Sequence, residues 1–290
     1  MRTRVFKTIG DCRILADIYG PDDGQVRPAI VWLHGGALIL GRRSNISQEQ
    51  VDFYVGAGYR LIALDYRLAP ETRLPEIVED VSDGLAWVRQ NADALAVDPH
   101  RLVVVGHSAG GYLTLMVGCR AQPRPRALVA FYGYGDILGE WYTRPSPFYC
   151  AQPRVARAAA HACVGTAPIS EVADSADRIP FYIYCRQQGL WPKEVSGWDP
   201  EIEPARFAPF CPVCNVTADF PPTLLLHGDR DSDVPCEQSL MMAEALARAG
   251  VPHELVLMPG GEHGFDLRGF TEPATRHAFD RVGDFLKRMP

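Results

Sequence analysis

A serine lies at the centre of Gly106-His-Ser-Ala-Gly110, which matches the pattern G-x-S-x-G. The residues before it, 102–105, are apolar and mostly β-branched, which predicts a buried strand, whereas the small and apolar residues 111–119 predict a helix. A serine at such a corner has an exposed hydroxyl group, because the two glycines leave room for a sharp turn. The pattern alone is also compatible with a simple glycine-rich turn. The strand and helix around it favour a nucleophile, Ser108.

A serine hydroxyl is a weak nucleophile, so it needs a histidine base that is oriented by a carboxylate. In an open parallel sheet, such groups gather at the carboxyl ends of the strands. His263 follows the apolar run 253–258 in a Gly-Gly-Glu-His-Gly loop, and we predict that it is the base. Asp231 lies in a His-Gly-x-x-Asp-x-x-Val-Pro pattern after another apolar run, and we predict that it is the acid. Asp229 and Asp233 in the same loop are the alternatives.

Three further histidines lie in or beside these motifs. His34 and His227 also end apolar runs, but each is followed directly by glycine in a motif with another explanation. His107 precedes the predicted nucleophile, and we expect its side chain to point away from it. Asp65 ends an earlier apolar run, and we expect it to brace the loop at 66–67.

A tetrahedral intermediate needs hydrogen-bond donors for its oxyanion. The segment His34-Gly-Gly-Ala37 follows the apolar run 28–33, and its glycines allow backbone amides to face inward. We predict that the amides of Gly35, Gly36 and Ala109 hold the oxyanion. A plain turn is the alternative interpretation of the two glycines.

The apolar runs that end in these motifs alternate with segments of helical periodicity. This alternation predicts an α/β fold with a mostly parallel sheet and helices on both faces. A Gly-Asp turn near the N-terminus predicts an antiparallel hairpin at one edge. The predicted strands are 5–9, 12–19, 28–33, 60–64, 102–105, 126–132, 222–227 and 253–258. The predicted helices are 47–57, one that begins at 74, 111–119, 237–249 and 271–288.

Residues 133–220 depart from this pattern and are rich in proline and aromatic residues. A segment of this length is unlike a single structureless loop. We therefore expect one domain, 1–290, into which 133–220 is inserted as a lid, with helices at 151–162 and 179–187. Its aromatic side chains either wall an apolar pocket or pack the insert onto the body of the domain. As substrate-binding residues we name Ala37, Leu38, Phe148 and Trp191.

Composition excludes several classes of function. The net charge is −6 and there is no basic cluster, so we expect no nucleic-acid partner. No apolar run approaches the roughly 18 residues of a membrane helix, and residues 1–10 do not resemble a signal peptide. We expect a cytoplasmic protein without a membrane partner; the oligomeric state is left open, with a homodimer as one option.

Eight cysteines are expected to be free thiols in a reducing compartment. Cys211-Pro-Val-Cys214 is a C-x-x-C pattern, but no second pair of ligands completes a zinc site at a familiar spacing. We therefore predict no metal site and no organic cofactor.

The chain resembles the α/β-hydrolases, and among them the acetyl-esterase and hormone-sensitive-lipase-like carboxylesterases. The order serine, aspartate, histidine along the chain is that of this fold. Two positions depart from the second group, which usually has aspartate at the place of His107 and a third glycine at the place of Ala37. The acid motif is closer to that of prolyl-oligopeptidase-like and dienelactone hydrolases. The matching segments are His34–Ala37, Asp65–Glu71, Gly106–Gly111, His227–Pro235 and Glu262–Phe265.

This resemblance implies a serine carboxylesterase that cleaves small to medium apolar esters through an acyl-enzyme. Two alternatives remain. The acid motif suggests an amidase or small peptidase, and the fold also occurs in non-catalytic ligand-binding proteins.

Overall fold

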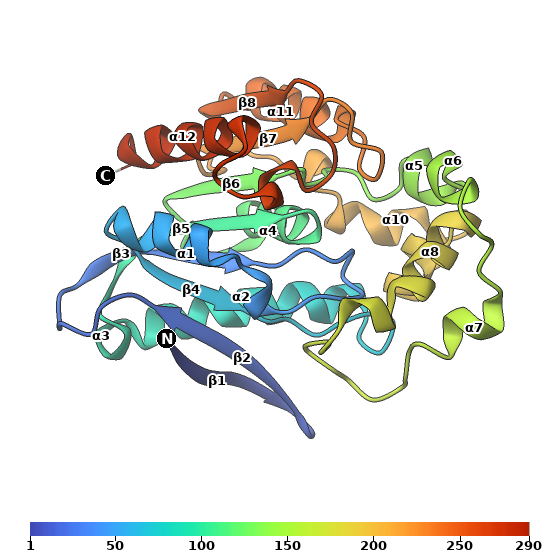
Figure 1. Ribbon diagram of the computed structural model, residues 1–290, viewed down its shortest axis with the longest axis horizontal. Helices are drawn as coiled ribbons and strands as arrows, with labels where there is room; N and C mark the ends of the chain where they lie inside the picture. The colour runs from blue at the N-terminus through green and yellow to red at the C-terminus, as the bar shows by residue number, and fades with distance from the viewer. Residues whose placement is uncertain (290) are drawn as a thin grey trace.

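The computed structural model describes residues 1–289, whose strands form one eight-stranded sheet in the order β1-β2-β4-β3-β5-β6-β7-β8 (Figure 1). β1 pairs antiparallel with β2 and β2 antiparallel with β4, whereas the other neighbouring strands are parallel. The prediction of a mostly parallel sheet with an antiparallel edge is confirmed. The strands are β1 (Arg2–Ile9), β2 (Cys12–Tyr19), β3 (Arg27–Leu33), β4 (Arg60–Leu64), β5 (Val97–His107), β6 (Ala127–Phe131), β7 (Thr223–Gly228) and β8 (His253–Met258).

Helices cover both faces of the sheet, and each face has its own apolar core. One core contains residues of α2 (Leu74–Gln90), α4 (Ala109–Arg120) and α11 (Glu237–Arg248). The other contains residues of α1 (Gln48–Gly56) and α12 (Pro273–Lys287). Central strands such as β4 are buried along their whole length, which explains why they appear in the sequence as continuous apolar runs. A short helix, α3 (Ala92–Leu95), precedes β5.

The predicted strands agree with the observed ones, and β5 differs most. It begins at Val97 and not at residue 102, because Val97 pairs with Arg27 at the start of β3. The Arg27 amide also donates to the Ala96 carbonyl at 3.1 Å. The residues 98–101 are polar and contain a proline, so no apolar pattern marks this extension in the sequence.

The segment between β6 and β7, residues 132–222, is called the insert below. Its helices are short and lie together beyond one end of the sheet, at the right of Figure 1. The predicted helix at 179–187 is confirmed as α8. The insert contains α5 (Glu140–Thr143), α6 (Pro147–Cys150), α7 (Arg157–His161), α8 (Ile179–Gln188), α9 (Trp191–Ser196) and α10 (Pro204–Phe207).

The predicted helix at 151–162 is wrong, because only Arg157–His161 is helical there. Residues before it are held by the side chain of Gln187, which accepts a hydrogen bond from the Val155 amide and donates one to the Pro153 carbonyl, both at 3.0 Å. These contacts with α8 replace the hydrogen bonds that a helix would make. Pro153 also disfavours a helix at the residue before it.

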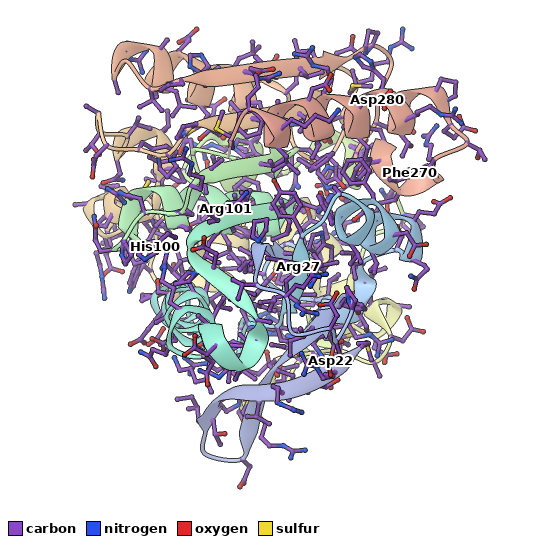
Figure 2. All side chains as sticks on the ribbon, turned by 90° about the vertical axis from the view of Figure 1, so that its left-hand side faces the viewer. Asp22, Arg27, His100, Arg101, Phe270 and Asp280 are labelled. Atoms are coloured by element: carbon purple, nitrogen blue, oxygen red, sulfur yellow. The ribbon has the colours of Figure 1, made fainter. Side chains whose placement is uncertain are left out.

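The opposite end of the sheet has a different surface. Figure 2 shows this side, where exposed charged or polar side chains such as Asp22, His100, Arg101 and Asp280 lie around the start of the strands. No helix within residues 1–289 is both long and apolar enough to cross a membrane. The predicted site residues follow the carboxyl ends of the strands, on the side of the insert.

Candidate active site

Ser108 lies at the corner between β5 and α4 with φ 55° and ψ −117°, a backbone conformation that residues other than glycine rarely adopt. The two glycines of the motif make this corner sterically possible. A Cβ atom on Gly106 would lie 2.1 Å from the Gly110 carbonyl oxygen, and one on Gly110 would lie 2.1 Å from the Leu33 carbonyl oxygen. The Ser108 amide donates to the Phe131 carbonyl at 2.9 Å, which connects the corner to β6.

The structure brings Ser108, His263 and Asp231 together. His263 Nε2 lies 3.1 Å from Ser108 Oγ, and His263 Nδ1 lies 2.7 Å from Asp231 Oδ2. Because a carboxylate only accepts hydrogen bonds, this contact puts the ring proton on Nδ1 and leaves Nε2 free to accept the serine proton. The amides of Asp233 and Val234 donate to the other oxygen of Asp231 at 2.9 and 2.8 Å, which fixes the carboxylate.

The other two carboxylates of this loop have different contacts. Asp229 accepts a hydrogen bond from the Gly260 amide at 2.6 Å and is exposed. Asp233 Oδ2 lies 3.8 Å from His263 Nε2, on the side of the ring that faces Ser108. Only Asp231 is therefore placed to orient the histidine through Nδ1.

Burial and nearby carboxylates change the pKa of His263. Burial by itself lowers the pKa of His263, but the hydrogen bond to Asp231 and the negative charges of Asp233, Asp231 and Asp266 outweigh it and raise the pKa above its ordinary value. Burial by itself raises the pKa of Asp231, but hydrogen bonds from His227 and His263 lower it overall. The pair therefore consists of a charged carboxylate and a histidine of increased basicity, which suits a general base.

His107 points away from Ser108, as expected, and contacts a buried aspartate that the sequence analysis did not identify. Its Nε2 lies 3.0 Å from Asp266 Oδ2. The same carboxylate accepts hydrogen bonds from Tyr132 Oη at 2.5 Å and Gln50 Nε2 at 3.0 Å. The only sequence signal for Asp266 is its position three residues after His263. Asp266 therefore links the corner that carries Ser108 to the loop that carries His263.

The remaining histidines at strand ends are structural. His227 Nδ1 lies 2.7 Å from Ser239 Oγ and its Nε2 lies 2.9 Å from the Val234 carbonyl, so it supports the loop of Asp231. His34 stacks on Tyr66 with ring centroids 4.1 Å apart. Burial lowers the pKa of His34 to about 4, which keeps this ring neutral.

The expected role of Asp65 is wrong. Its carboxylate accepts hydrogen bonds from the Arg43 amide at 2.7 Å and from Arg43 Nη1 at 2.6 Å. Asp80 is the residue that binds Arg67, at 2.7 and 2.8 Å. Asp65 is fully buried at the end of β4, and burial raises its pKa to about 7 despite the Arg43 contacts, which lower it.

The glycine pair after β3 forms a tight turn beside Ser108. Gly36 has φ +114°, and a Cβ atom there would lie 2.0 Å from the Leu40 carbonyl oxygen. A Cβ atom on Gly35 would lie 3.3 Å from the Cβ of Ser108, so a glycine allows this turn to approach the corner closely. Among residues 1–289, no hydrogen bond uses the amides of Gly36 or Ala109. Ala109 is the first residue of α4, where helix amides are free to bind an anion.

Ser108 and His263 open into a cavity of about 500 Å³ between the sheet and the insert. Its wall is mainly apolar, which fits a small ligand held by a few polar groups. Gly35 and Gly36 also line this cavity. The other lining residues are Trp32, Ala37, Leu40, Gly41, Asn45, His107, Tyr132, Phe148, Tyr149, Gln152, Ser175, Ile179, Tyr182, Ile183, Asp233, Gly264 and Leu267.

Two of the four predicted substrate-binding residues are therefore on the wall, Ala37 and Phe148, and two are not. Leu38 and Trp191 are each 0% exposed and pack in the core, so the expectation that they contact substrate is wrong. Trp191 Nε1 donates to the Ala37 carbonyl at 2.8 Å, and its ring stacks on Tyr142 with centroids 4.1 Å apart. It supports the glycine turn from behind.

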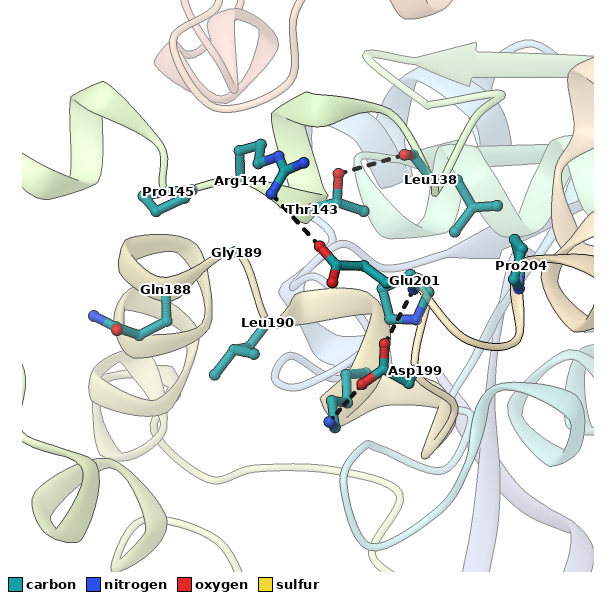
Figure 3. A pocket seen from close by; sticks show the side chains of 12 residues that line it. Leu138, Thr143, Arg144, Pro145, Gln188, Gly189, Leu190, Asp199, Glu201 and Pro204 are labelled. Atoms are coloured by element: carbon teal, nitrogen blue, oxygen red, sulfur yellow. Dashed lines mark hydrogen bonds and ion pairs between the residues drawn. The ribbon is translucent and has the colours of Figure 1, made fainter.

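A second hollow lies within the insert and is shown in Figure 3. Its charged side chains pair with one another: Arg144 lies 3.5 Å from Glu201, and Lys193 lies 2.8 Å from Asp199. None of the predicted catalytic residues line it. It is therefore separate from the predicted catalytic residues.

Cys211 is buried and Cys214 is exposed, and both are free thiols. Within residues 1–289, no group of three or more histidine, cysteine or acidic side chains is arranged to hold a metal ion.

Comparison with protein families and solved structures agrees with this architecture. The BD-FAE family model matches residues 16–246. A solved structure of a protein of unknown function from Staphylococcus aureus is 24% identical, covers 100% of this chain and 99% of its own, and has a TM-score of 0.82. A thermophilic esterase, Est2 of Thermogutta terrifontis, is 25% identical, with 99% of this chain and 93% of its own covered and a TM-score of 0.68. An acetyl ester-xyloside bifunctional hydrolase from Caldicellulosiruptor lactoaceticus is 22% identical and has a TM-score of 0.74. The match covers 99% of this chain and 96% of the hydrolase.

Curated relatives of a different kind also match. The non-reducing polyketide synthase ausA of Emericella nidulans is 28% identical over 99% of this chain. Preu3, a non-reducing polyketide synthase of Preussia isomera, is 26% identical over 90% of it. The chain spans only 14% and 12% of the length of these two relatives.

Proposed function

The chain belongs to the BD-FAE family and is a hydrolase of the α/β-hydrolase fold, and from this premise we propose that it is a serine carboxylesterase that uses Ser108, His263 and Asp231. Its substrates are small to medium esters with an apolar part that fits the cavity. In this proposal residues 1–290 are one domain, and the insert is the lid of the cavity.

The proposed reaction has two halves. Ser108 Oγ attacks the ester carbonyl carbon while His263 Nε2 takes the serine proton. The amides of Gly35, Gly36 and Ala109 hold the oxyanion, and His263 then returns the proton to the leaving alcohol as the acyl-enzyme forms. Water then loses a proton to His263 and attacks the acyl carbon, and the bond to Ser108 Oγ breaks as His263 returns the proton to this oxygen and the acid leaves. Asp231 holds the ring and compensates its positive charge in both halves.

One observation carries this proposal: the contacts of 3.1 Å from Ser108 to His263 and of 2.7 Å from His263 to Asp231, at the wall of a cavity of about 500 Å³. A serine in a strained corner, a base and an orienting carboxylate form the hydrogen-bonded chain that activates a hydroxyl nucleophile.

The test is Ser108→Ala, assayed on p-nitrophenyl acetate and butyrate. We expect kcat to fall by at least about 10⁴-fold, because the nucleophile is lost. Ser82→Ala is the matched control, since Ser82 lies in α2 and its hydroxyl group donates to the Val78 carbonyl in the same helix. A fluorophosphonate should add to the wild-type protein, with the adduct on Ser108 in the peptide map. Undiminished hydrolysis by Ser108→Ala, or an adduct elsewhere, would contradict the proposal.

The polyketide synthase relatives favour a second candidate, in which the same serine accepts a polyketide-type acyl group from a thioester. The nucleophile and base would act in the same way, with a thiol as the leaving group. Matched acyl groups presented as an oxygen ester, an N-acetylcysteamine thioester and an amide separate the two. A kcat/KM for the thioester far above that of the ester would favour this candidate, and a preference for the amide would favour the amidase alternative.

A further inference from the structure

Asp233 has an unusual position for a carboxylate, because it lies on the wall of a largely apolar cavity. Among the cavity-lining residues within 1–289 it is the only acidic one, and no lysine or arginine lines the cavity. Its side chain is 15% exposed. The reaction proposed above gives it no role, since Asp231 already orients His263.

A charged group at such a place must be stabilised, because burial of an unpaired charge is costly. Arg186 of α8 fulfils this need. Its Nη1 donates to Asp233 Oδ1, and its Nη2 donates to the Asp233 carbonyl at 3.0 Å. Tyr182 Oη donates to the same Oδ1 at 2.6 Å. The insert therefore holds one oxygen of this carboxylate in a fixed place.

Arg186 is itself held from several sides. Its side chain is 2% exposed, and the rings of Trp141, Tyr142, Tyr149 and Tyr182 lie 4.8–5.7 Å from its guanidinium carbon. Aromatic faces attract a desolvated guanidinium. These contacts fix the Arg186 side chain, and through it the insert sets the position of the Asp233 carboxylate.

The second oxygen of Asp233 is different. The hydrogen bonds from Arg186 and Tyr182 go to Oδ1, whereas Oδ2 lies 3.8 Å from His263 Nε2. Nε2 is the atom that returns a proton to the leaving alcohol. The leaving oxygen must therefore come within hydrogen-bond distance of Nε2, which brings the atoms next to it in the alcohol close to Asp233 Oδ2.

We propose that Asp233 is a specificity-determining residue whose Oδ2 accepts a hydrogen bond from a donor on the leaving alcohol, one or two atoms from the ester oxygen. This inference rests on the proposed esterase reaction and adds the class of alcohol: one that carries a neighbouring hydroxyl group. The same carboxylate disfavours alcohols that carry an anionic group at that place, because like charges repel.

The test compares three butanoate esters in a pH-stat: 2-hydroxyethyl, 2-methoxyethyl and choline butanoate. The first has a donor, the second lacks it, and the third has a positive charge without a donor. We expect the wild-type protein to show a kcat/KM for the hydroxyethyl ester about tenfold or more above that for the methoxyethyl ester, as for a hydrogen bond to a charged group. In Asp233→Asn this ratio should fall toward one.

Asp280→Asn is the matched control, since it removes the same charge from an exposed position on α12. It should keep the wild-type ratio. Each variant is assayed at the pH at which its activity is constant, and its thermal unfolding is recorded. Because the ratio is first measured on the wild-type protein, the test does not depend on the stability of the variant.

Three results would overturn the inference: no preference of the wild-type protein for the hydroxyethyl ester, a preference that Asp233→Asn retains in full, or a preference for the choline ester alone. These results leave the esterase proposal intact. Failure of that proposal would be seen differently, as absence of Ser108-dependent hydrolysis of all three esters.

Discussion

The sheet and the insert meet at the cavity, but different interactions hold them. In the sheet, β3 to β8 form a continuous ladder of parallel pairs between two apolar cores. The insert has no strand, and α5, α6 and α10 contain four residues each. Helices of this length are unstable alone, so tertiary contacts must position them, and α5 packs against α9 and α6 against α8.

Ion pairs of arginines are among the contacts that connect the insert with the rest of the domain. Arg178 lies 2.7 Å from Glu71, and both side chains are almost completely buried. Arg186 binds Asp233 in the same loop as Asp231. Arg43, near the glycine turn, lies 2.6 Å from Glu171 of the insert, which is half-exposed. The difference suggests a division of labour in which strand ends supply the proposed chemistry and the insert selects the substrate.

The largest effect should come from the sheet side of the cavity. Asp231→Asn keeps the size of the side chain but removes the charge that compensates the imidazolium and fixes the ring proton. We expect kcat to fall by about 10³–10⁴-fold, with little change in KM. The measurement is steady-state hydrolysis of p-nitrophenyl butyrate.

The matched control is Asp229→Asn in the same loop. Asp229 contacts the Gly260 amide and not the histidine, so its activity should remain within a few-fold of wild type. An equal loss in both variants would mean that the loop, and not the Asp231 carboxylate, is what the base requires.

The same division explains which parts could be predicted from the sequence. β4 has the predicted bounds, because a strand that is buried along its whole length appears as a continuous apolar run. β8 is only partly buried and also has the predicted bounds. The meeting of Ser108, Asp231 and His263 followed from one rule, that parallel strands end at the same edge of the sheet. These residues come from local patterns, and the sheet brings them together.

The insert was predicted less well because its structure depends on distant partners. Nothing near Trp191 in the sequence indicates that its indole bonds the Ala37 carbonyl rather than a substrate. The position of the Asp233 carboxylate depends on a hydrogen bond from Arg186, which lies 47 residues earlier in the chain. Outside the insert, Leu38 has φ 61°, and its residue type does not indicate this left-handed conformation. Such positions follow from tertiary contacts and not from periodicity.

The next largest effect should be on stability and should come from the buried ion pair between Arg178 of the insert and Glu71. Glu71→Gln removes the charge opposite Arg178, whose side chain is 4% exposed. A buried cation that loses its partner should lower the free energy of unfolding by about 3 kcal/mol. Urea denaturation followed by tryptophan fluorescence measures this change. A loss below about 1 kcal/mol would show that the apolar contacts hold the insert without this pair.

A smaller effect, on the pH profile, tests whether Asp233, the carboxylate that Arg186 of the insert holds, changes the pKa of His263. Three carboxylates face His263, those of Asp231, Asp233 and Asp266, and together they raise its pKa above the ordinary value. Only neutral His263 accepts a proton, so kcat/KM should rise with pH through this pKa and reach half its maximum above about 6.5.

Asp233→Asn removes one of these charges, so the pKa of His263 should fall and the acid side of the profile should move to lower pH. The readout is kcat/KM for ethyl butanoate, which has no donor on its alcohol, between about pH 5 and 9. Asp280→Asn should leave the profile in place. An unmoved profile in Asp233→Asn would mean that the charge of Asp233 does not change the pKa of His263.

The smallest effect should come from the exposed contact, Glu171→Gln. It is the same substitution as Glu71→Gln and also removes the partner of an arginine, but the Glu171 side chain is 42% exposed and that of Glu71 only 2%. Arg43 would keep Asp65 at 2.6 Å and Asp17 at 3.1 Å. Water and these carboxylates compensate its charge, so the free energy of unfolding should change by less than about 1 kcal/mol, and further salt should reduce this difference. Urea denaturation at low and high salt measures both. Equal losses from the two glutamine variants would mean that burial does not decide how strongly an ion pair holds the insert.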